Sequence, residues 1–268
     1  MELTLSDKLF KKFSDFFFEK TGIKLKDYKK YLIINRLAKF VGVDNEFKDY
    51  EELYEALKSD NSPELVVKFI NAITTNFSFF FRERIHFDFL AHFFKNIYKP
   101  SNYLRIWSAA CSTGEEAYSI AMTALDNLAL SEITKLKILG TDISTKVIDT
   151  ARKGVYDYEK IENHLDNRLI TNYFLKDGNN LVIKDFIKSF VEFKYLNLMN
   201  HYPFTKEFDV VFLRNVLIYF DNKEKEHIIN NIYPYIKKGG YLIIGLSEST
   251  VGIKHNFKSL KYSIYKKE

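Results

Sequence analysis

The second half of this 268-residue chain alternates short apolar runs with amphipathic segments, and this alternation is the strongest constraint on its fold. Runs typical of strands cover 103–108, 136–142, 190–196, 208–214 and 240–247, and patterns typical of helices cover 115–129, 145–153 and 222–237. Such alternation predicts a mostly parallel sheet with helices on both faces. Ligands of such sheets bind at the carboxyl ends of the strands.

The N-terminal part has a different pattern, because its apolar side chains recur at helical spacing. Examples are Leu9, Phe10, Phe13, Phe16 and Phe17. Gly22 stands where the first helix would end. We therefore expect a helical N-terminal domain of residues 1–76 and an α/β domain of residues 77–268. A less regular stretch predicts a small insert around 155–189, with a hairpin turn at 177–179.

Composition excludes several classes of protein. No run of 18 apolar residues occurs, and the first thirty residues do not resemble a secretion signal. The single cysteine, Cys111, excludes an internal disulfide and is expected to be a small buried residue. The six histidines lack metal-ligand spacing, so we expect no metal site. Together these features predict a cytoplasmic protein that does not insert into a membrane.

Basic residues gather near the N-terminus. From Lys20 to Lys39 there are seven basic residues and one acid, Asp27, in a chain of net charge +5. Such a run is usually a solvated helix face, but it also suits docking of an acidic partner. Charge alone does not decide between a protein and a nucleic acid as that partner.

Small residues join the first predicted strand of the sheet to the following helix, in the run Ser108 to Glu116 (SAACSTGEE). At such a turn the backbone can approach a ligand closely, and the first N–H groups of the helix are free to bind it. Glu115 and Glu116 open that helix and would repel a phosphate. The turn therefore favours a cationic or hydroxyl-rich ligand such as S-adenosylmethionine.

Polar side chains also follow the next two predicted strands. Asp142 closes one of them, where a carboxylate can accept hydrogen bonds from both ribose hydroxyls, although an acid before a helix is also a common cap. Asn197 and Leu198 follow the other. The amide of Asn197 suits the edge of an adenine ring and Leu198 suits its face, while turn formation explains the asparagine equally well.

The fourth predicted strand runs into a charged residue. The apolar sequence of FDVVFLRNVLIYFD, residues 208–221, is interrupted by Arg214 and Asn215. A charge beside an apolar core is costly unless it is paired or functional. We expect both residues to face a ligand at the strand end, with Tyr219 one helical turn later. A structural ion pair of Arg214 is the alternative.

The segment Thr74 to Glu83 (TTNFSFFFRE) joins the two predicted domains. Its three consecutive phenylalanines, residues 79–81, are most simply explained as packing between those domains. Packing does not explain the polar side chains of Asn76, Ser78 and Arg82, so these are candidates for a ligand site. The sequence offers no Ser-His-Asp or Cys-His arrangement for nucleophilic catalysis.

Six stretches of the chain resemble, in their order and spacing, the CheR-type chemotaxis receptor methyltransferases. They are TTNFSFFFRE, RIWSAACSTGEEAYSIAM, GTDIS, the Asn197-Leu198 pair, FDVVFLRNVLIYFD and GGYLIIGLSES, between residues 74 and 249. The GxGxG turn of many other methyltransferases is replaced by ACSTGEE. The resemblance implies a Rossmann-like class I methyltransferase domain with a small all-α N-terminal domain. It also implies a protein-glutamate O-methyltransferase that transfers methyl groups from S-adenosylmethionine to membrane chemoreceptors.

The same resemblance implies the site residues. The cofactor pocket would be formed by Asn76, Ser78, Arg82, Glu116, Asp142, Asn197, Leu198, Arg214 and Asn215, and the product would be S-adenosylhomocysteine. Arg82 and Tyr219 would lie near the transferred methyl group and act in catalysis. Ser78 and Ala117 replace the family's usual threonine and proline, and neither change removes a functional group that the pocket needs.

The implied partner is the cytoplasmic helical bundle of a membrane chemoreceptor, which the basic segment would dock. The docking residues would be Lys24, Lys26, Lys29, Lys30, Arg36 and Lys39. We expect a monomer that binds no nucleic acid. Some family members grip a receptor tail peptide with the insert, but the short hairpin at 176–180, with a single glycine, predicts that this chain does not.

Two other functions stay open at this stage. One is a methyltransferase that acts on RNA or on a small molecule. Methylation of base amines usually accompanies an Asn/Asp-Pro-Pro-aromatic run after the fourth strand, and this chain has Arg-Asn-Val-Leu there. The other is a non-catalytic module that senses S-adenosylmethionine, and the presence of Arg82 and Tyr219 counts against it.

Overall fold

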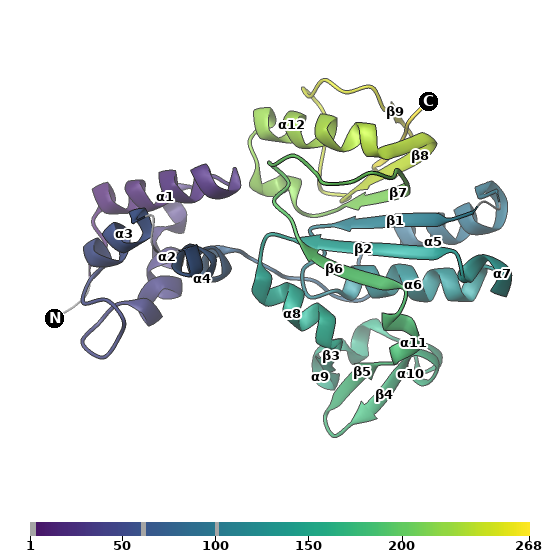
Figure 1. Ribbon diagram of the computed structural model, residues 1–268, viewed down its shortest axis with the longest axis horizontal. Coiled ribbons are helices and arrows are strands. Elements are labelled where there is room, and N and C mark those ends of the chain that lie inside the picture. Colours follow the sequence, from purple (N-terminus) through teal and green to yellow (C-terminus); the bar gives the residue numbers. More distant parts are fainter. Residues whose placement is uncertain (1–3, 60–62, 100–101) are drawn as a thin grey trace.

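The computed structural model describes residues 4–59, 63–99 and 102–268, which form a helical bundle and an α/β domain (Figure 1). The bundle contains α1 (Asp7–Thr21), α2 (Lys30–Leu37), α3 (Tyr50–Lys58) and α4 (Pro63–Ile73), with 3-10 turns at Asp27–Lys29 and Ala38–Phe40. No helix in the described part of the chain is long and apolar enough to cross a membrane.

Local sequence signals explain the limits of α1. The hydroxyl of Ser6 accepts a hydrogen bond from the Leu9 N–H at the helix start, and Gly22 ends the helix in a left-handed conformation, as predicted. The apolar face of α1 is buried against α4, where the ring of Phe69 lies 5.7 Å from that of Phe13 and 6.1 Å from that of Phe17. The bundle therefore has its own aromatic core.

The α/β domain is built on a seven-stranded sheet of order β6-β2-β1-β7-β8-β10-β9. Its strands are β1 (Leu104–Ala109), β2 (Leu136–Asp142), β6 (Val191–Tyr195), β7 (Phe208–Leu213), β8 (Ile236–Ile244), β9 (Lys258–Ser259) and β10 (Ile264–Lys266). The first five are parallel to one another, and β10 and β9 complete one edge in antiparallel pairing. This confirms the predicted mostly parallel sheet.

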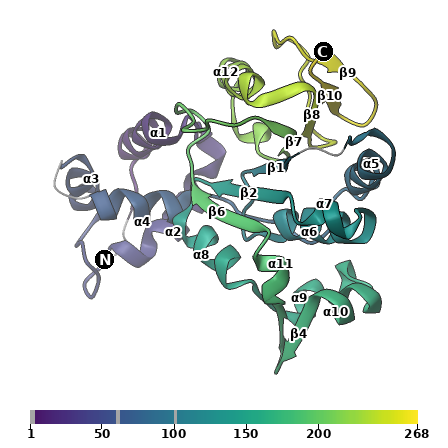
Figure 2. The same ribbon diagram turned by 45° about the vertical axis from the view of Figure 1, so that its right-hand side comes forward.

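Helices cover both faces of this sheet, as predicted (Figures 1 and 2). One core contains side chains of α5 (Ile85–His92), α6 (Glu115–Asn127) and α8 (Thr145–Lys153), and the other contains side chains of α12 (Asn222–Ile232). Neighbours on β1 divide between these cores, Ile106 entering the first and Trp107 the second, because successive side chains of a strand point to opposite faces. The remaining short elements are α7 (Leu130–Ile133), a π-helical turn at Phe93–Ile97 and 3-10 turns at Leu217–Tyr219 and Tyr233–Tyr235.

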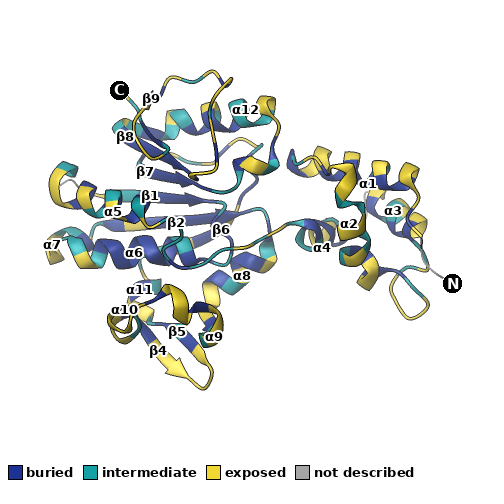
Figure 3. Ribbon diagram, turned by 180° about the vertical axis from the view of Figure 1, so that it is seen from behind, coloured by how far each residue is buried: buried dark blue, intermediate teal, exposed yellow. Residues whose placement is uncertain are grey.

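The insert between β2 and β6 forms a small antiparallel sheet of order β3-β5-β4. It comprises β3 (Val155–Asp157), α9 (Tyr158–Ile161), a 3-10 turn at Glu162–His164, α10 (Asn167–Tyr173), β4 (Phe174–Asp177), β5 (Asn180–Ile183) and α11 (Asp185–Lys188). The expected hairpin is confirmed, with Gly178 and Asn179 as its turn. Figure 3 shows that most of β4 is exposed, whereas the central strands of the large sheet are buried.

Two local predictions are wrong. The helix expected to reach residue 237 leaves the α-helical form at Ile232, because Pro234 has no N–H to donate to the preceding turn. The phenylalanines 79–81 pack on the α/β domain rather than between the two domains, with the ring of Phe79 4.3 Å from that of His164 and the ring of Phe81 5.3 Å from that of Phe87. Phe80 is buried within the α/β domain, with its ring 5.0 Å from Tyr156 and 5.4 Å from Phe174 of the insert.

Candidate functional site

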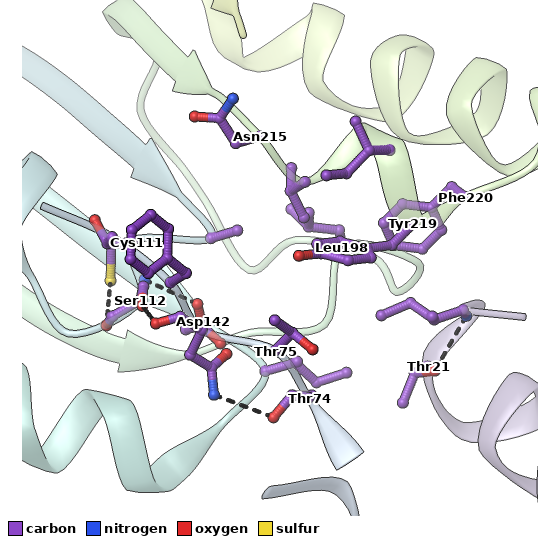
Figure 4. Close-up of a pocket in the computed structure, with 18 of the residues that line it drawn as sticks. Thr21, Thr74, Thr75, Cys111, Ser112, Asp142, Leu198, Asn215, Tyr219 and Phe220 are labelled. Atoms are coloured by element: carbon purple, nitrogen blue, oxygen red, sulfur yellow. Dashed lines mark hydrogen bonds between the residues drawn. The ribbon is translucent and has the colours of Figure 1, made fainter. Parts of the chain in front are cut away.

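A cavity of about 210 Å³ opens at the carboxyl ends of the parallel strands, between the two domains. Its walls come from the segments that follow β1, β2, β6 and β7, from the connecting residues 73–79, and from α1 and α2. Figure 4 shows Thr21 of α1 on one side, and Cys111, Ser112 and Asp142 on the other. All ten residues that the sequence analysis assigned to the site line this cavity.

The turn between β1 and α6 has the tight backbone that its small residues suggested. Ala110 and Ser112 adopt positive φ angles of 64° and 51°, and Gly114 has φ 96°. A Cβ on Gly114 would lie 2.8 Å from the Cβ of Ala151, so only glycine allows α6 to start this close to α8. Cys111 is buried in this turn, as predicted.

Asp142 ends β2 and is held by backbone donors. Its carboxylate accepts hydrogen bonds from the N–H groups of Ser112 and Ser144, each at 2.9 Å. Burial raises the pKa of Asp142, although these backbone hydrogen bonds oppose that effect. The carboxylate lies on the cavity wall, at the position where a parallel sheet presents acceptors to a ribose.

Glu116 and Arg214 form an ion pair inside the site, with 2.8 Å between Glu116 Oε2 and Arg214 Nη1. Ser108 donates its hydroxyl to the other oxygen of Glu116 at 2.7 Å. Burial raises the pKa of Glu116, and the charge of Arg214 counteracts this. The Arg214 side chain is 1% exposed and also pairs with Glu83 at 3.1 Å. Arg214 therefore forms the structural ion pair that was the alternative interpretation of the sequence, and it also lines the cavity.

Arg82 and Tyr219 approach the cavity from different segments. The guanidinium of Arg82 donates to the carbonyl of Phe77 at 3.1 Å and lies 5.8 Å and 5.7 Å from the ring centres of Phe77 and Phe79. Tyr219 ends a 3-10 turn after β7, with the ammonium of Lys29 5.6 Å from its ring centre. Burial raises the pKa of Tyr219, while the charge of Arg82 acts to lower it.

Asn76 and Ser78 lie on the connecting segment. The carbonyl of Asn76 accepts a hydrogen bond from the hydroxyl of Ser112 at 3.0 Å, and its side-chain amide donates to Thr74 at 3.3 Å. The hydroxyl of Ser78 interacts with the carboxylate of Glu115 and acts to lower its pKa, which burial raises. These contacts attach the connecting segment to the β1–α6 turn.

The amide of Asn197 is used within the protein. Its oxygen accepts from the Met199 N–H at 3.0 Å, which is the turn explanation left open from the sequence. Its nitrogen donates to the carbonyl of Lys20 at 2.8 Å and so links the α/β domain to the end of α1. Leu198 is buried and lines the cavity.

Sequence reasoning missed two carboxylates next to the site. Glu83 contacts Arg214 and Asn215, and Glu248 accepts from the backbone N–H groups of Gly245, Asn215 and Ile218 at 2.6, 2.8 and 3.2 Å. Both lie in stretches that resemble the methyltransferase family, Glu83 in TTNFSFFFRE and Glu248 in GGYLIIGLSES, and this resemblance is the sequence signal that points to them. The contribution of the helical bundle to the cavity was also missed, because contacts between α1, α2 and the strand ends leave no local pattern.

The six basic residues proposed for docking divide into two groups. Lys24, Lys26 and Lys39 are exposed. The other three are only partly exposed: Lys30 pairs with Asp7 at 2.6 Å, and Lys29 lies over Tyr219, as Lys39 lies over its neighbour Phe40. Arg36 donates to the carbonyls of Ile73 and Thr74 at the end of α4, so it attaches α2 to the connecting segment.

Comparisons with known proteins agree over nearly the whole chain. Residues 8–74 match the family model described as the all-alpha domain of CheR methyltransferase, and residues 76–266 match its SAM binding domain. A chemotaxis protein methyltransferase of Borreliella burgdorferi is 40% identical, with 92% of this chain and 89% of the relative covered. One of Escherichia coli is 34% identical, with 98% and 92% covered.

Proposed function

Because the chain belongs to the CheR methyltransferase family, we propose that it transfers methyl groups from S-adenosylmethionine to glutamate side chains of chemotaxis receptors. The products would be glutamate methyl esters and S-adenosylhomocysteine. The observation that carries this proposal is that Arg82, Tyr219 and Asp142, from three distant segments, line one cavity.

The chemistry of the wall fits S-adenosylmethionine. Asp142 and Glu116 offer acceptors for ribose hydroxyls and for the amino group, and Ile143 and Leu198 offer an apolar surface for adenine. Arg214 lines the same wall, and its positive charge suits the carboxylate of the ligand. We therefore expect these residues to hold the methyl donor. Asn76, Ser78, Asn197 and Asn215 would complete the pocket.

When bound, S-adenosylmethionine supplies a methyl group made electrophilic by its sulfonium. The glutamate that receives it has an unperturbed pKa of about 4.3, so it is already ionised at neutral pH and no general base is needed. We assign Arg82 to holding this carboxylate and Tyr219 to orienting it. Since a carboxylate loses its charge as the ester forms, a cavity that excludes water favours the reaction. Alignment would then be the main contribution of the protein.

We propose that the receptor docks on the helical bundle through Lys24, Lys26 and Lys39. These three lysines are exposed and extend from a domain that also forms part of the cavity wall. Their charge suits an acidic helical surface, and each methylation would remove one negative charge from it. Lys29, Lys30 and Arg36, which are only partly exposed, would contribute less to docking.

The first test is calorimetric binding of S-adenosylmethionine and S-adenosylhomocysteine. Saturable binding by the wild-type chain should weaken about 10- to 100-fold in Asp142→Ala, because the acceptors for the ribose hydroxyls are lost. Asp185→Ala removes a fully exposed carboxylate of the insert and serves as the control that should bind normally. Absence of binding at millimolar concentrations would contradict the proposed function.

A second assay identifies the acceptor. The chain is incubated with a chemoreceptor cytoplasmic fragment and donor labelled in its methyl group. Label released as a volatile product by mild base indicates a methyl ester. Stable label on RNA or on a small molecule would instead favour a different methyltransferase, and binding without any transfer would favour a sensor of S-adenosylmethionine.

A further inference from the structure

A partly buried carboxylate outside the cavity wall, that of Glu83, holds the segment that carries Arg82. We propose that Glu83 is a positioning residue, whose carboxylate fixes the backbone around Arg82 against the ends of β7 and β8 and so sets the guanidinium for methyl transfer. The role of Arg82 in this inference rests on the proposed function. Glu83 itself acts through its neighbour and does not line the cavity.

The contacts of Glu83 join three segments. Its Oε1 accepts from the side-chain amide of Asn215 at 3.0 Å, and its Oε2 accepts from Nη2 of Arg214 at 3.1 Å. The backbone N–H of Leu246, just after β8, also donates to Oε2 at 3.1 Å. One carboxylate therefore connects the Arg82 segment to both strand ends beside the cavity.

The backbone around Arg82 needs such a restraint. Phe81 and Glu83, on either side of it, have φ angles of 55° and 56°, which are unfavourable for residues other than glycine. The Phe81 N–H donates to the hydroxyl of Ser119 at 3.0 Å, and Arg214 donates to the carbonyl of Arg82. Strained conformations persist only where surrounding contacts fix them, and Glu83 supplies the charged part of these contacts.

The charge of Glu83 matters as well as its shape. The Arg214 side chain is 1% exposed and the Glu83 side chain 16%, so removing one partner would leave a buried charge poorly compensated. Burial alone would raise the pKa of Glu83, but the hydrogen bond from Asn215 and the charge of Arg214 outweigh it and hold the pKa below its ordinary value. A glutamine would replace one accepting oxygen with a donor group that faces other donors.

The Glu83→Gln variant tests whether the segment is held, by hydrogen exchange measured on peptides covering residues 77–84. We expect exchange in these peptides to rise about tenfold, with exchange in α3 unchanged, because only the local restraint is lost. Asp126→Asn is the matched control. It removes a carboxylate that pairs with Arg168 at a distance of 2.9 Å, and neither residue lines the cavity. Unchanged exchange at residues 77–84 in Glu83→Gln would overturn the proposal.

Kinetics test whether Glu83 acts through Arg82. In Glu83→Gln we expect kcat to fall about 10- to 100-fold, a larger factor than the loss of affinity for S-adenosylmethionine, which also weakens because Arg214 and Asn215 of the cavity wall lose a partner. In an Arg82→Lys background the same change should lower kcat less than about twofold, because the group being positioned is already absent. Equal losses in both backgrounds would show that Glu83 does not act through Arg82.

Two further comparisons distinguish an effect on folding from an effect on methyl transfer. Glu83→Asp keeps the charge with a shorter reach and should fall between wild type and Glu83→Gln in both kcat and exchange. If Asp and Gln variants lose the same thermal stability yet keep wild-type kcat, Glu83 is structural only and the proposal fails. A wild-type chain that transfers no methyl group contradicts the proposed function, while the exchange experiment still decides whether Glu83 holds the segment.

Discussion

Two arginines of the cavity, Arg82 and Arg214, are used differently. Arg214 donates to Glu83, to Glu116 and to the carbonyl of Arg82, which leaves only its Nε without a partner in the described part of the chain. Within the described part of the chain, the Arg82 side chain donates one hydrogen bond, to the Phe77 carbonyl, so most of its five donors are available. A guanidinium with free donors at the wall of a cavity suits the binding of an incoming carboxylate.

Replacing Arg82 tests this assignment. In Arg82→Ala we expect kcat to fall about 100- to 1,000-fold, as for other single donors that stabilise reacting charge, with the Kd for S-adenosylmethionine changed only slightly. Single-turnover kinetics and calorimetry measure the two quantities separately. Arg84→Ala is the control, because Arg84 lies on the same segment, outside the cavity wall, and should leave kcat unchanged. Equal losses of binding and turnover would show that Arg82 is structural.

At the scale of elements, the site depends on where helices begin and end. The end of α1 meets the loop after β6, where the Asn197 amide donates to the Lys20 carbonyl. Gly22 makes this approach possible, because it ends α1 with φ 73° and a Cβ there would lie 2.5 Å from Cγ of Met199. A single residue therefore satisfies both the helix termination and the contact between domains.

Gly22→Ala should be destabilising for two reasons, the left-handed backbone and the contact with Met199. We expect the free energy of unfolding to fall by about 2 kcal/mol, of which roughly 1 kcal/mol is the backbone term. Gly178→Ala isolates that term, because Gly178 has φ 56° and open space around its Cβ position. Urea denaturation of both variants measures the difference. Equal losses in the two would mean that Met199 moves aside without cost.

At the scale of the whole molecule, the cavity exists because two cores are held together. The Asn71 side chain of α4 donates to Thr145 at 2.9 Å and accepts from the hydroxyl of Ser144 at 2.8 Å, at the start of α8. Arg36 attaches α2 to the connecting segment. The helical bundle is therefore both a docking candidate and part of the wall, which would place a docked receptor next to the reacting groups.

The stability of the whole molecule should depend on pH through His86, whose side chain is fully buried on α5. Burial, together with the charge of Arg214, lowers the pKa of His86 to about 4 from an ordinary 6.5, while the carboxylate of Glu83 and the carbonyl of Tyr262 oppose this. The ring stays neutral in the folded state, whereas the unfolded chain takes up a proton below pH about 6.5. Stability is therefore lost as the pH falls from about 6.5 towards 4.

The His86→Gln variant isolates this effect. From these pKa values, the wild-type chain should lose about 2 kcal/mol of unfolding free energy between pH 7 and pH 5 through this one group. That part of the loss should be absent in His86→Gln and present in His92→Gln, which replaces an exposed histidine of the same helix. Urea titrations at the two pH values provide the comparison. An unchanged pH dependence in His86→Gln would contradict the assignment.

The class of fold and ten of the residues that line the cavity could be predicted from the sequence, in part from local patterns and in part from the resemblance to a family. Apolar runs and amphipathic periods are local properties, so the parallel sheet, the helical start and the insert hairpin could all be predicted. The strand ends were predicted within a few residues for β1, β2 and β7, and parallel strands bring their carboxyl ends to one edge. Asp142, Asn197 and Arg214 therefore had to lie near one another.

The tertiary structure alone decided what each of these side chains contacts. Asn197 binds the carbonyl of Lys20, Arg36 binds the end of α4, and Glu83 joins the ends of two strands. Each contact unites positions far apart in the chain, and its partner is selected by packing and by the requirement that buried charges be paired. No local pattern encodes such a choice. The cavity wall is divided between the two domains for the same reason, because contacts between distant parts of the chain bring the domains together.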